Sequence, residues 1–506
     1  MREARNDTDP TSARRWVTLI GPLLFVILLL MPRPAGMTSA GQTTLAMAGW
    51  MAAWWLTVAV PLAVTALLPL VVLPAFGVAS PAAAAAPFAN PVIFLFMGGF
   101  FVAAAMQRWA LHRRLALAVV AWTGTSPRRL IAGFMAASAL LSMWMSNTAA
   151  TLMMMPIGVA VLSLVLPAGR AADGPVAPSA GGFSDRRGLG VALMLGIAYA
   201  GSIGGVATLI GTPPNAVLAA MADEMLHVDV SFARWLAIGL PVSVVMLVLC
   251  WALLCFVLFR LSGKPLPQAA QVIGAERARL GSWHRAEQVS AVVFALAALA
   301  WILRAPKQVG ELTIPGIQTL LPQVGDATIA IAAALVLFLW PVTDRSGLPT
   351  RVLDWTHARR IPWDILVLFG GGLSLAFAFE ASGLTEWLGG KLGVLAGLPD
   401  LVIIASVATT FVFVTEITSN TATATLGLPI MAALGPSVGV APLTLMTAAA
   451  MGSSMAFMLP VATPPNAIVF GTGYLRATDM SRAGFALNLV GIVVISTAVA
   501  LLLGTA

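Results

Sequence analysis

Long apolar runs alternate with short polar connectors along most of the chain. A helix needs about 20 apolar residues to cross the hydrocarbon core of a bilayer, and runs near this length recur many times. They extend from Trp16 to Met31, Thr43 to Val78, Pro91 to Met106, Trp235 to Phe259, Ala291 to Leu303, Ala327 to Pro341 and Phe485 to Leu503. The pattern predicts an all-α polytopic membrane protein with about eleven transmembrane helices.

The composition agrees with this pattern. The chain has 506 residues, of which 59% are hydrophobic and 9% are charged, whereas soluble domains carry about 25% charged residues. The first apolar run follows Arg14 and Arg15, but no small-residue cleavage site ends it, so we interpret it as a retained span. Cys250 and Cys255 lie in one apolar run, which indicates neither a disulfide framework nor a metal site.

The net charge of +8 comes from basic residues in the short connectors. Because arginine and lysine concentrate on the cytoplasmic side of membrane proteins, the pattern predicts a cytoplasmic N-terminus, an external C-terminus and no nucleic-acid partner. The acidic connector from Ala222 to Val230 then lies outside. We expect a multi-pass protein of the cytoplasmic (inner) membrane, provided that two segments described next enter and leave on the same side.

Three motifs occur twice, at matched spacings. They begin at Leu95 and Leu368 (LFMGG and LFGGG), at Ser146 and Ser419 (Ser-Asn-Thr), and at Thr212 and Thr463 (Thr-Pro-Pro-Asn). The first two motifs are 51 residues apart in both halves, and the third follows a Gly-Ser pair by 11 residues in both. Residues 167–188, a polar stretch rich in Pro, Gly and Ala, explain why the second and third motifs are 66 residues apart in one half and 44 in the other. The chain is therefore predicted to contain an internal repeat.

The charge rule orients the two halves oppositely, which predicts an inverted repeat of the kind that builds secondary transporters around a midplane site. Residues 1–42 are expected to form a cytoplasmic N-terminus and the first transmembrane helix, 43–262 the first repeat, 263–288 a cytoplasmic linker and 289–506 the second repeat. Each repeat is expected to contain a re-entrant helical hairpin, entering from the cytoplasm at 129–166 and from outside at 400–437. Each also contains a broken helix, at 188–222 and at 442–473.

The breaks follow from the double prolines, which remove amide donors and clash with the preceding helical turn. A broken helix leaves free N–H groups at one end and free carbonyls at the other, which suit an anion and a cation respectively. The triplets add neutral amides and hydroxyls. No Lys or Arg occurs between Leu130 and Gly169, Gly188 and Met221, or Leu443 and Leu475. An anion bound there must be met by neutral donors and co-bound cations, which predicts cation coupling.

The paired triplets, paired TPPN motifs, LFxGG segments and span count together resemble the divalent anion/sodium symporter (DASS) family, which carries di- and tricarboxylates or sulfate. The resemblance covers nearly the whole chain after Thr43, with the motifs in order. It implies scaffold and transport domains, an elevator-type mechanism in the lipid bilayer and a homodimer. It also implies Na⁺ as the coupling ion, no other metal, no organic cofactor, and uptake of a small dicarboxylate such as succinate, malate or fumarate.

The resemblance further implies roles for individual residues. The substrate carboxylates would face Asn147, Thr148, Asn420 and Thr421, with Thr463 and Pro464 nearby. One Na⁺ would bind to Ser142, Ser146, Asn147 and the backbone around Gly204 and Gly205, and a second to Thr415, Ser419, Asn420 and the backbone near Ala462. Ser142 and Thr415 each stand one helical turn before their triplet, which suits a shared cation cage.

Other interpretations stay open. Small polar residues also join membrane helices without binding a ligand, but two matched triplets followed by double-proline breaks favour a site. Glu416 has three possible roles, namely to relay a proton, to contribute charge to a cation site or to cap a helix start, and structural or electrostatic support is favoured over direct ligation. Glycines 98–99 and 370–372 are expected to serve close helix packing.

Two other classes of function are disfavoured. An enzyme would need a nucleophile with a base or a His/Asp/Glu metal set inside the membrane, and a channel would need a continuous polar pore. Within transport, the alternatives are a dicarboxylate exchanger or a citrate or sulfate carrier of the same fold, because hydroxyl and amide donors fit carboxylate and sulfate alike. Thr423 and Thr425 are positioned to shift the size preference.

Overall fold

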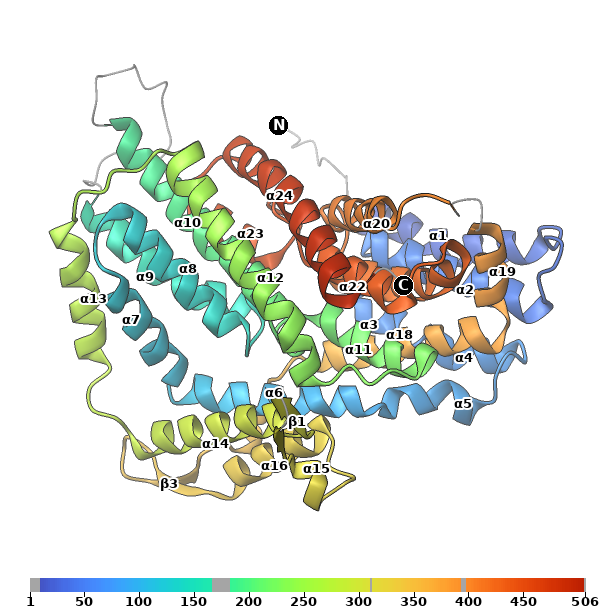
Figure 1. Cartoon of the computed structure of the whole chain (residues 1–506), viewed down its shortest axis with the longest axis horizontal. Coiled ribbons are helices and arrows are strands. Elements are labelled where there is room, and N and C mark those ends of the chain that lie inside the picture. Colours follow the sequence, from blue (N-terminus) through green and yellow to red (C-terminus); the bar gives the residue numbers. More distant parts are fainter. Residues whose placement is uncertain (1–9, 166–182, 310–311, 393–396, 505–506) are drawn as a thin grey trace, which may run out of the picture.

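The computed structural model describes residues 10–165, 183–309, 312–392 and 397–504 (Figure 1). Most of the polar insertion at 167–188 and the first nine residues lie outside this description. Figure 1 shows α7 to α10 and α13 at one end of the molecule and α1, α2, α4, α5 and α19 at the other.

Helices make up nearly all of the described chain. Up to the middle of the sequence they are α1 (Pro10–Leu30), α2 (Ser39–Thr57), α3 (Leu62–Thr65), α4 (Leu68–Ala75), α5 (Pro81–Ala85) with a 3₁₀ turn (Ala86–Ala89), α6 (Pro91–Arg108), α7 (Leu111–Thr123), α8 (Pro127–Ser142), α9 (Asn147–Val165), α10 (Phe183–Val206), α11 (Pro213–Leu226), α12 (Phe232–Ala252) with a π turn (Leu253–Leu258) and α13 (Pro267–Arg279). The remainder are α14 (Arg285–Ile302), α15 (Ile317–Leu320), α16 (Asp326–Leu339), α17 (Trp355–Ala358), α18 (Trp363–Ala381), α19 (Leu384–Leu392), α20 (Asp400–Thr415), α21 (Asn420–Val438), α22 (Pro442–Ser453), α23 (Pro464–Phe470) and α24 (Ala477–Leu503).

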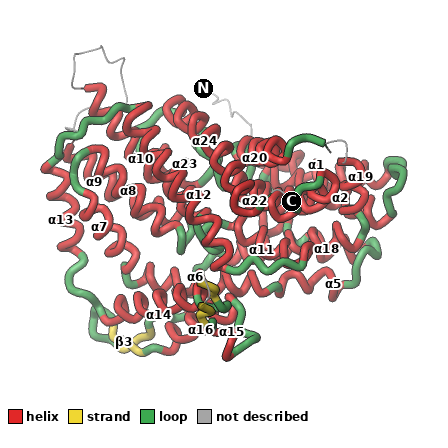
Figure 2. The backbone as a smooth tube through the Cα atoms, viewed as in Figure 1, coloured by secondary structure: helices red, strands yellow, loops and turns green. Residues whose placement is uncertain are grey.

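The predicted all-α polytopic class is confirmed. Eight helical segments in the described chain are long and apolar enough to cross a membrane, and four shorter apolar helices accompany them. Short strands also occur, in connectors: β1 (Lys307–Val309) pairs with β2 (Leu312–Ile314), and β3 (Pro341–Thr343) with β4 (Pro349–Arg351), both antiparallel. Figure 2 shows the strands confined to the region around α14 to α16. The sequence patterns gave no sign of these hairpins.

The long apolar run from Thr43 to Val78 is divided into α2, α3 and α4. Val58 ends α2 in the left-handed conformation with φ 48°, and Pro61 then precedes α3. The boundary expected after residue 42 falls inside α2. The segment expected to be a linker, 263–288, contains α13 and the first turn of α14.

Two helices are interrupted at the TPPN motifs. The first stops at Val206 and resumes as α11 at Pro213, and the second stops at Ser453 and resumes as α23 at Pro464. Proline suits the first helical turn because the amide that it lacks would have no intrahelical partner there. The Ser-Asn-Thr triplets stand at the tips of two helical hairpins, α8–α9 and α20–α21.

The glycine motifs pack helices closely, as predicted. A Cβ at Gly98 would lie 2.6 Å from the carbonyl carbon of Ala330, so α6 and α16 touch through their backbones. In the other half, a Cβ at Gly371 would collide with the carbonyl of Ala66. These glycines allow direct contact between the backbones of neighbouring segments.

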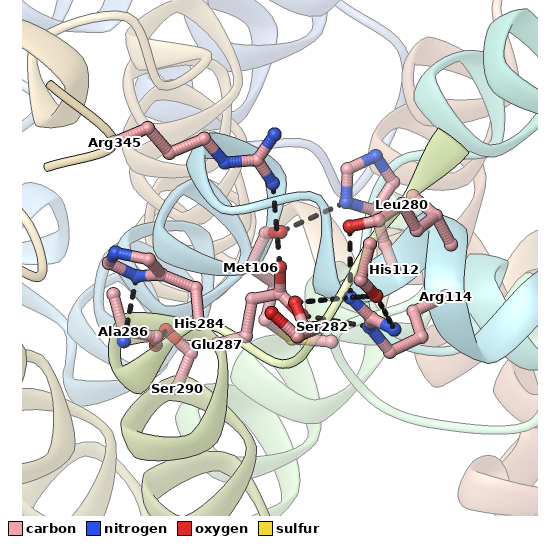
Figure 3. A network of polar contacts seen from close by, with 11 residues as sticks. Met106, His112, Arg114, Leu280, Ser282, His284, Ala286, Glu287, Ser290 and Arg345 are labelled. Carbon is pink, nitrogen blue, oxygen red and sulfur yellow. Dashed lines mark hydrogen bonds and ion pairs between the residues drawn. The ribbon is translucent and has the colours of Figure 1, made fainter. Parts of the chain in front are cut away.

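A polar network joins α7 to α14 (Figure 3). Glu287, which is 1% exposed, accepts a 2.8 Å hydrogen bond from Arg114 Nε and lies 3.6 Å from Arg345 NH2. The Arg114 guanidinium also donates to the carbonyls of residues 280, 281 and 282. Burial lowers the pKa of His112 in the same network, against the effect of its hydrogen bond with the Met106 carbonyl.

Glu287→Ala is expected to destabilise the protein by about 3 kcal/mol, because it leaves Arg114 without its buried counterion. Arg345→Ala should cost under about 1 kcal/mol, because that side chain is mostly exposed. Thermal unfolding of the purified protein in detergent measures both. Equal shifts of the two variants would contradict a network centred on the Arg114–Glu287 pair.

Candidate functional site

The two hairpin tips repeat one hydrogen-bonded arrangement. Ser142 Oγ donates to Asn147 Oδ1 at 2.7 Å, and Thr415 Oγ1 donates to Asn420 Oδ1 at 2.7 Å. Ser142 and Thr415 are fully buried, whereas both asparagines are partly exposed. Each hydroxyl ends the first limb of its hairpin and each asparagine begins the second. The two pairs therefore occupy equivalent positions in the sequence repeat and have the same hydrogen-bond geometry.

Oxygen atoms gather around the first pair. A Cβ at Gly205 would lie 2.6 Å from Asn147 Oδ1 and 3.0 Å from the carbonyl oxygen of Gly211. A Cβ at Gly211 would lie 2.9 Å from the carbonyl oxygen of Ser142. The missing side chains at these two glycines let backbone carbonyls approach the hydroxyl and amide oxygens. Such a set of neutral oxygens suits a hard monovalent cation.

The second pair has a related but less open surrounding. Thr415 Oγ1 lies 2.8 Å from the carbonyl oxygen of Ser453, at the end of α22. Alignment of the TPPN motifs places Ala456 and Ala462 where the first half has Gly205 and Gly211. The second half therefore offers hydroxyl, amide and carbonyl oxygens with methyl groups among them.

The asparagine of each TPPN motif closes its helix break. Asn215 Nδ2 donates to the carbonyls of Gly205, Val206 and Thr208, at 3.3, 3.2 and 2.7 Å. In the other half, Asn466 Nδ2 donates to Ala456 and Leu459, at 3.2 and 3.0 Å. Both amides satisfy carbonyls that a continuous helix would have bonded internally. Asn215 and Asn466 therefore stabilise the two helix breaks.

In the second half, Glu416 accepts hydrogen bonds from backbone N–H groups of the interrupted segment. Its carboxylate accepts from the amides of Phe457, Met458 and Leu459, at 2.7 to 3.2 Å. Asn488 Nδ2 donates a further 2.7 Å hydrogen bond to Oε1. The side chain is 3% exposed. Among the roles left open for Glu416, these contacts favour support of the broken segment.

The first half lacks an equivalent carboxylate. Alignment of the triplets places Met143 opposite Glu416. Here Thr208 Oγ1 donates to the Met143 carbonyl at 2.5 Å, so the break is tied to the hairpin tip by a neutral bond. Each hairpin tip and the helix break beside it are called a half-site below. The two half-sites share the Ser/Thr–Asn pair but differ in buried charge.

Contacts between the halves cross over. Helix α9, which begins with Asn147, contacts α23, which follows the second break. Helix α21 contacts α11, which follows the first break.

The other predicted site residues differ in exposure. Thr421 and Thr463 are 8% and 5% exposed, whereas Ser146, Thr148, Ser419 and Ala462 are partly exposed and Pro464 is exposed. Gly204 lies against the backbone of Ala139 and serves packing.

Sequence reasoning missed three contributors to these contacts. Gly211 and Ser453 supply backbone carbonyls, which no side-chain pattern indicates. Asn488 was detectable in principle, because it is an isolated amide within the last apolar run. Thr423 contacts Thr418 across 2.5 Å between hydroxyl oxygens beside the tip of the second hairpin, and Thr425 lies against Gly372 of α18.

Comparison with known proteins identifies the family. The sequence profile of the sodium:sulfate symporter transmembrane region matches residues 12–504. This chain belongs to that family. The resemblance to divalent anion/sodium symporters, drawn from the repeated motifs, is confirmed.

Two relatives are similar over nearly their whole length. The "Sodium-dependent dicarboxylate transporter SdcS" of Staphylococcus saprophyticus is 43% identical over 477 residues, which cover 94% of this chain and 89% of the relative. Its namesake in Staphylococcus aureus strain USA300 is 40% identical over 487 residues, covering 96% and 91%. This member of the symporter family is therefore a transporter and not an enzyme, as the sequence indicated.

Two solved structures share the fold of this symporter-family chain. They are the YdaH transporter of Alcanivorax borkumensis, with TM-score 0.54 and 15% identity, and MtrF of Neisseria gonorrhoeae, with TM-score 0.53 and 14% identity. Each alignment covers 98% of this chain, and it covers 98% of the YdaH chain and 95% of MtrF. At these identities the likeness shows the fold alone.

Glu416→Gln is expected to destabilise the protein by about 3 kcal/mol, because an amide NH₂ then faces backbone N–H donors. Uptake should fall as the second break loses its shape. Met143→Gln, at the mirror position, should leave both thermal unfolding in detergent and uptake near wild type. A Glu416→Gln variant with wild-type stability and uptake would contradict the bracing role.

Proposed function

We propose that this protein imports C4-dicarboxylates such as succinate, malate or fumarate together with Na⁺. The observation that carries the proposal is the mirrored pair, Ser142 with Asn147 and Thr415 with Asn420, each at 2.7 Å. The names of the full-length relatives support the same ion and substrate class. Two equivalent oxygen clusters at two hairpin tips suit two cations beside one anion.

The hydroxyl and amide oxygens keep capacity for a cation while hydrogen-bonded to each other. A hydroxyl that donates its proton to an amide oxygen retains two lone pairs, and the amide oxygen retains one. Na⁺ is proposed to bind Ser142, Ser146, Asn147 and carbonyls near Gly204 and Gly205, and, in the other half, Thr415, Ser419, Asn420 and the carbonyl near Ala462. The substrate carboxylates are proposed to meet the Asn147, Thr148, Asn420 and Thr421 side chains, close to Thr463 and Pro464.

Charge balance supports coupling to cations. The carboxylate of Glu416 adds a negative charge beside the second half-site. No Lys or Arg occurs between Leu130 and Gly169 or between Leu392 and Leu475 to oppose it or to neutralise a dianion. Transfer of each charge against an inside-negative potential costs about 2.3 kcal/mol per 100 mV, so net-driven uptake of a dianion needs at least about three monovalent cations.

The proposed arrangement in the membrane follows the distribution of basic residues. The N-terminus is placed in the cytoplasm and the C-terminus outside the cytoplasmic membrane, with the first hairpin entering from the cytoplasm and the second from outside. An elevator-type movement of the hairpins and broken helices against the flanking helices, and a homodimeric assembly, complete the proposal.

Asn147→Ala and Asn420→Ala are each expected to abolish Na⁺-driven uptake of labelled succinate into proteoliposomes, because each removes an oxygen and a donor from a half-site. Thr410→Ala is the control, since this exposed hydroxyl on the second hairpin bonds only to the Ser406 carbonyl among its described contacts. Retained wild-type uptake in either asparagine variant, with the protein folded in the membrane, would remove that residue from the site.

Ser142→Ala and Thr415→Ala are expected to raise the Na⁺ concentration that gives half-maximal uptake by about tenfold, because one cation ligand is lost at a cost near 1.4 kcal/mol. The succinate KM measured at saturating Na⁺ should stay near wild type. A raised succinate KM with unchanged Na⁺ dependence would place the hydroxyls with the substrate instead.

An exchanger and a citrate or sulfate carrier are the alternatives. Uptake of labelled succinate, citrate and sulfate, with and without a Na⁺ gradient, separates them. Strong uptake that needs internal dicarboxylate and ignores Na⁺ would favour the exchanger.

A further inference from the structure

The tip of the first hairpin lies in an aromatic cluster supplied by other helices. The Trp144 ring stacks on Phe232 with centroids 5.8 Å apart and meets Phe294 edge-on at 4.6 Å. Trp301 lies 4.8 Å from Phe232 and 6.4 Å from Trp144. Phe232 begins α12, whereas Phe294 and Trp301 belong to α14. The tip is therefore held by rings from two helices outside its own hairpin.

An ion cluster fixes the same aromatic residues. Arg304, which is 8% exposed, places Nη2 2.5 Å from Asp229 Oδ2 and Nε 3.3 Å from Asp326 Oδ1. Asp326 Oδ2 accepts from the Phe232 amide at 2.7 Å, and its carbonyl accepts from Trp301 Nε1 at 3.0 Å. The cluster thus links the connector before α12 to the connector between α14 and α16.

The two carboxylates around Arg304 differ in exposure. The Asp229 side chain is 68% exposed, whereas that of Asp326 is 8% exposed. An exposed partner exchanges readily with water, so its bond is weak. If Asp229 leaves, Arg304 keeps Asp326 as a counterion and no buried charge is left alone. The arrangement therefore permits Asp229 to leave Arg304 without a large penalty, while Asp326 still accepts from the Phe232 amide.

The two half-sites differ in how deeply their residues are buried. Ile210, in the first break, is 6% exposed and lies 3.4 Å from the position that a Cβ of Gly99 on α6 would occupy. The space left among Gly99, Ile210, Trp144 and the rings of α14 is about 10 Å³, enough for one water at most. At the mirror positions, Ile417 replaces Trp144 and is 73% exposed, and Val461 replaces Ile210 and is 86% exposed.

We propose that the aromatic cluster and the Arg304 ion cluster form a clamp that covers the first half-site, and that this clamp opens during each transport cycle. Trp144 and Asp229 are positioning residues in it: Trp144 fixes the tip that carries Asn147, and Asp229 is the releasable ion partner. The inference rests on the proposed carrier function, because a carrier must expose its site alternately to the two sides. The contacts that have to break are those of the aromatic cluster and the bond between Arg304 and Asp229.

Single cysteines at the mirror positions test the clamp. Ile210→Cys and Val461→Cys are labelled with a small maleimide in the full-length protein, with the unmodified chain as background, because its own Cys250 and Cys255 are buried. We expect labelling at position 210 to be about tenfold slower than at position 461, because a covered site reacts only when it opens.

Variants of the clamp should speed labelling at position 210 alone. Asp229→Asn is expected to raise that rate about threefold, in line with the strength of exposed ion pairs. Trp144→Ala should raise it further, and Trp144→Phe should restore most of the protection. Asp223→Asn is the control, since Asp223 carries the same charge, lies near the end of α11 and is exposed. It should leave the rate unchanged.

Three results would overturn the clamp: equal labelling at 210 and 461, no response to Asp229→Asn, or a rise at both positions in the Asp229→Asn variant. The last result would mean general destabilisation. Labelling needs no substrate, so the clamp can fail while Na⁺-driven succinate uptake persists. Conversely, absent uptake would reject the proposed substrate and leave the labelling pattern intact.

Discussion

Every backbone N–H and C=O group inside a bilayer needs a partner from the protein, because hydrocarbon supplies none. This chain breaks two helices in its interior and must therefore provide partners twice. Asn215 and Asn466 donate to the orphaned carbonyls. In the second half, Glu416 accepts from three orphaned amides. The irregular segments on which the site depends are stable because a few polar side chains replace the missing helical hydrogen bonds.

The same constraint explains why the halves are alike in one respect and different in another. The Ser/Thr–Asn pairs are equal in geometry, because each must join the two limbs of a hairpin at its tip. The breaks beneath them are held differently, by Thr208 in one half and by Glu416 in the other. Burial differs as well, since Ile210 is covered and its counterpart Val461 is exposed. A sequence repeat here preserves the ligand geometry and lets the surroundings diverge.

Much of this organisation was predictable from the sequence because it rests on proline, glycine and repeat spacing. The double prolines located both helix breaks, and the matched intervals located both hairpin tips. The clamp was not predictable, because Trp144 is far in sequence from Phe294 and Arg304, and only tertiary packing brings them together. The carbonyls near Gly211 and Ser453 were missed because backbone oxygens leave no residue-type signal. The β-hairpins were missed because each strand has three residues, too few for an alternating pattern.

Charge near the second hairpin tip is concentrated on one residue. Glu416 is the sole ionisable residue between Leu401 and Ala441, and its two oxygens receive N–H donors from Phe457, Met458, Leu459 and Asn488. These neutral donors satisfy both carboxylate oxygens, so Glu416 is held by hydrogen bonds to the backbone and to Asn488. It therefore adds negative charge near the second tip while its lone pairs are largely occupied. A cation at the adjacent Thr415–Asn420 oxygens would feel this charge through a short distance of low dielectric without direct ligation. In the proposed function, a dianion would be repelled by this charge unless that cation were bound, which couples the proposed substrate site to the proposed cation site.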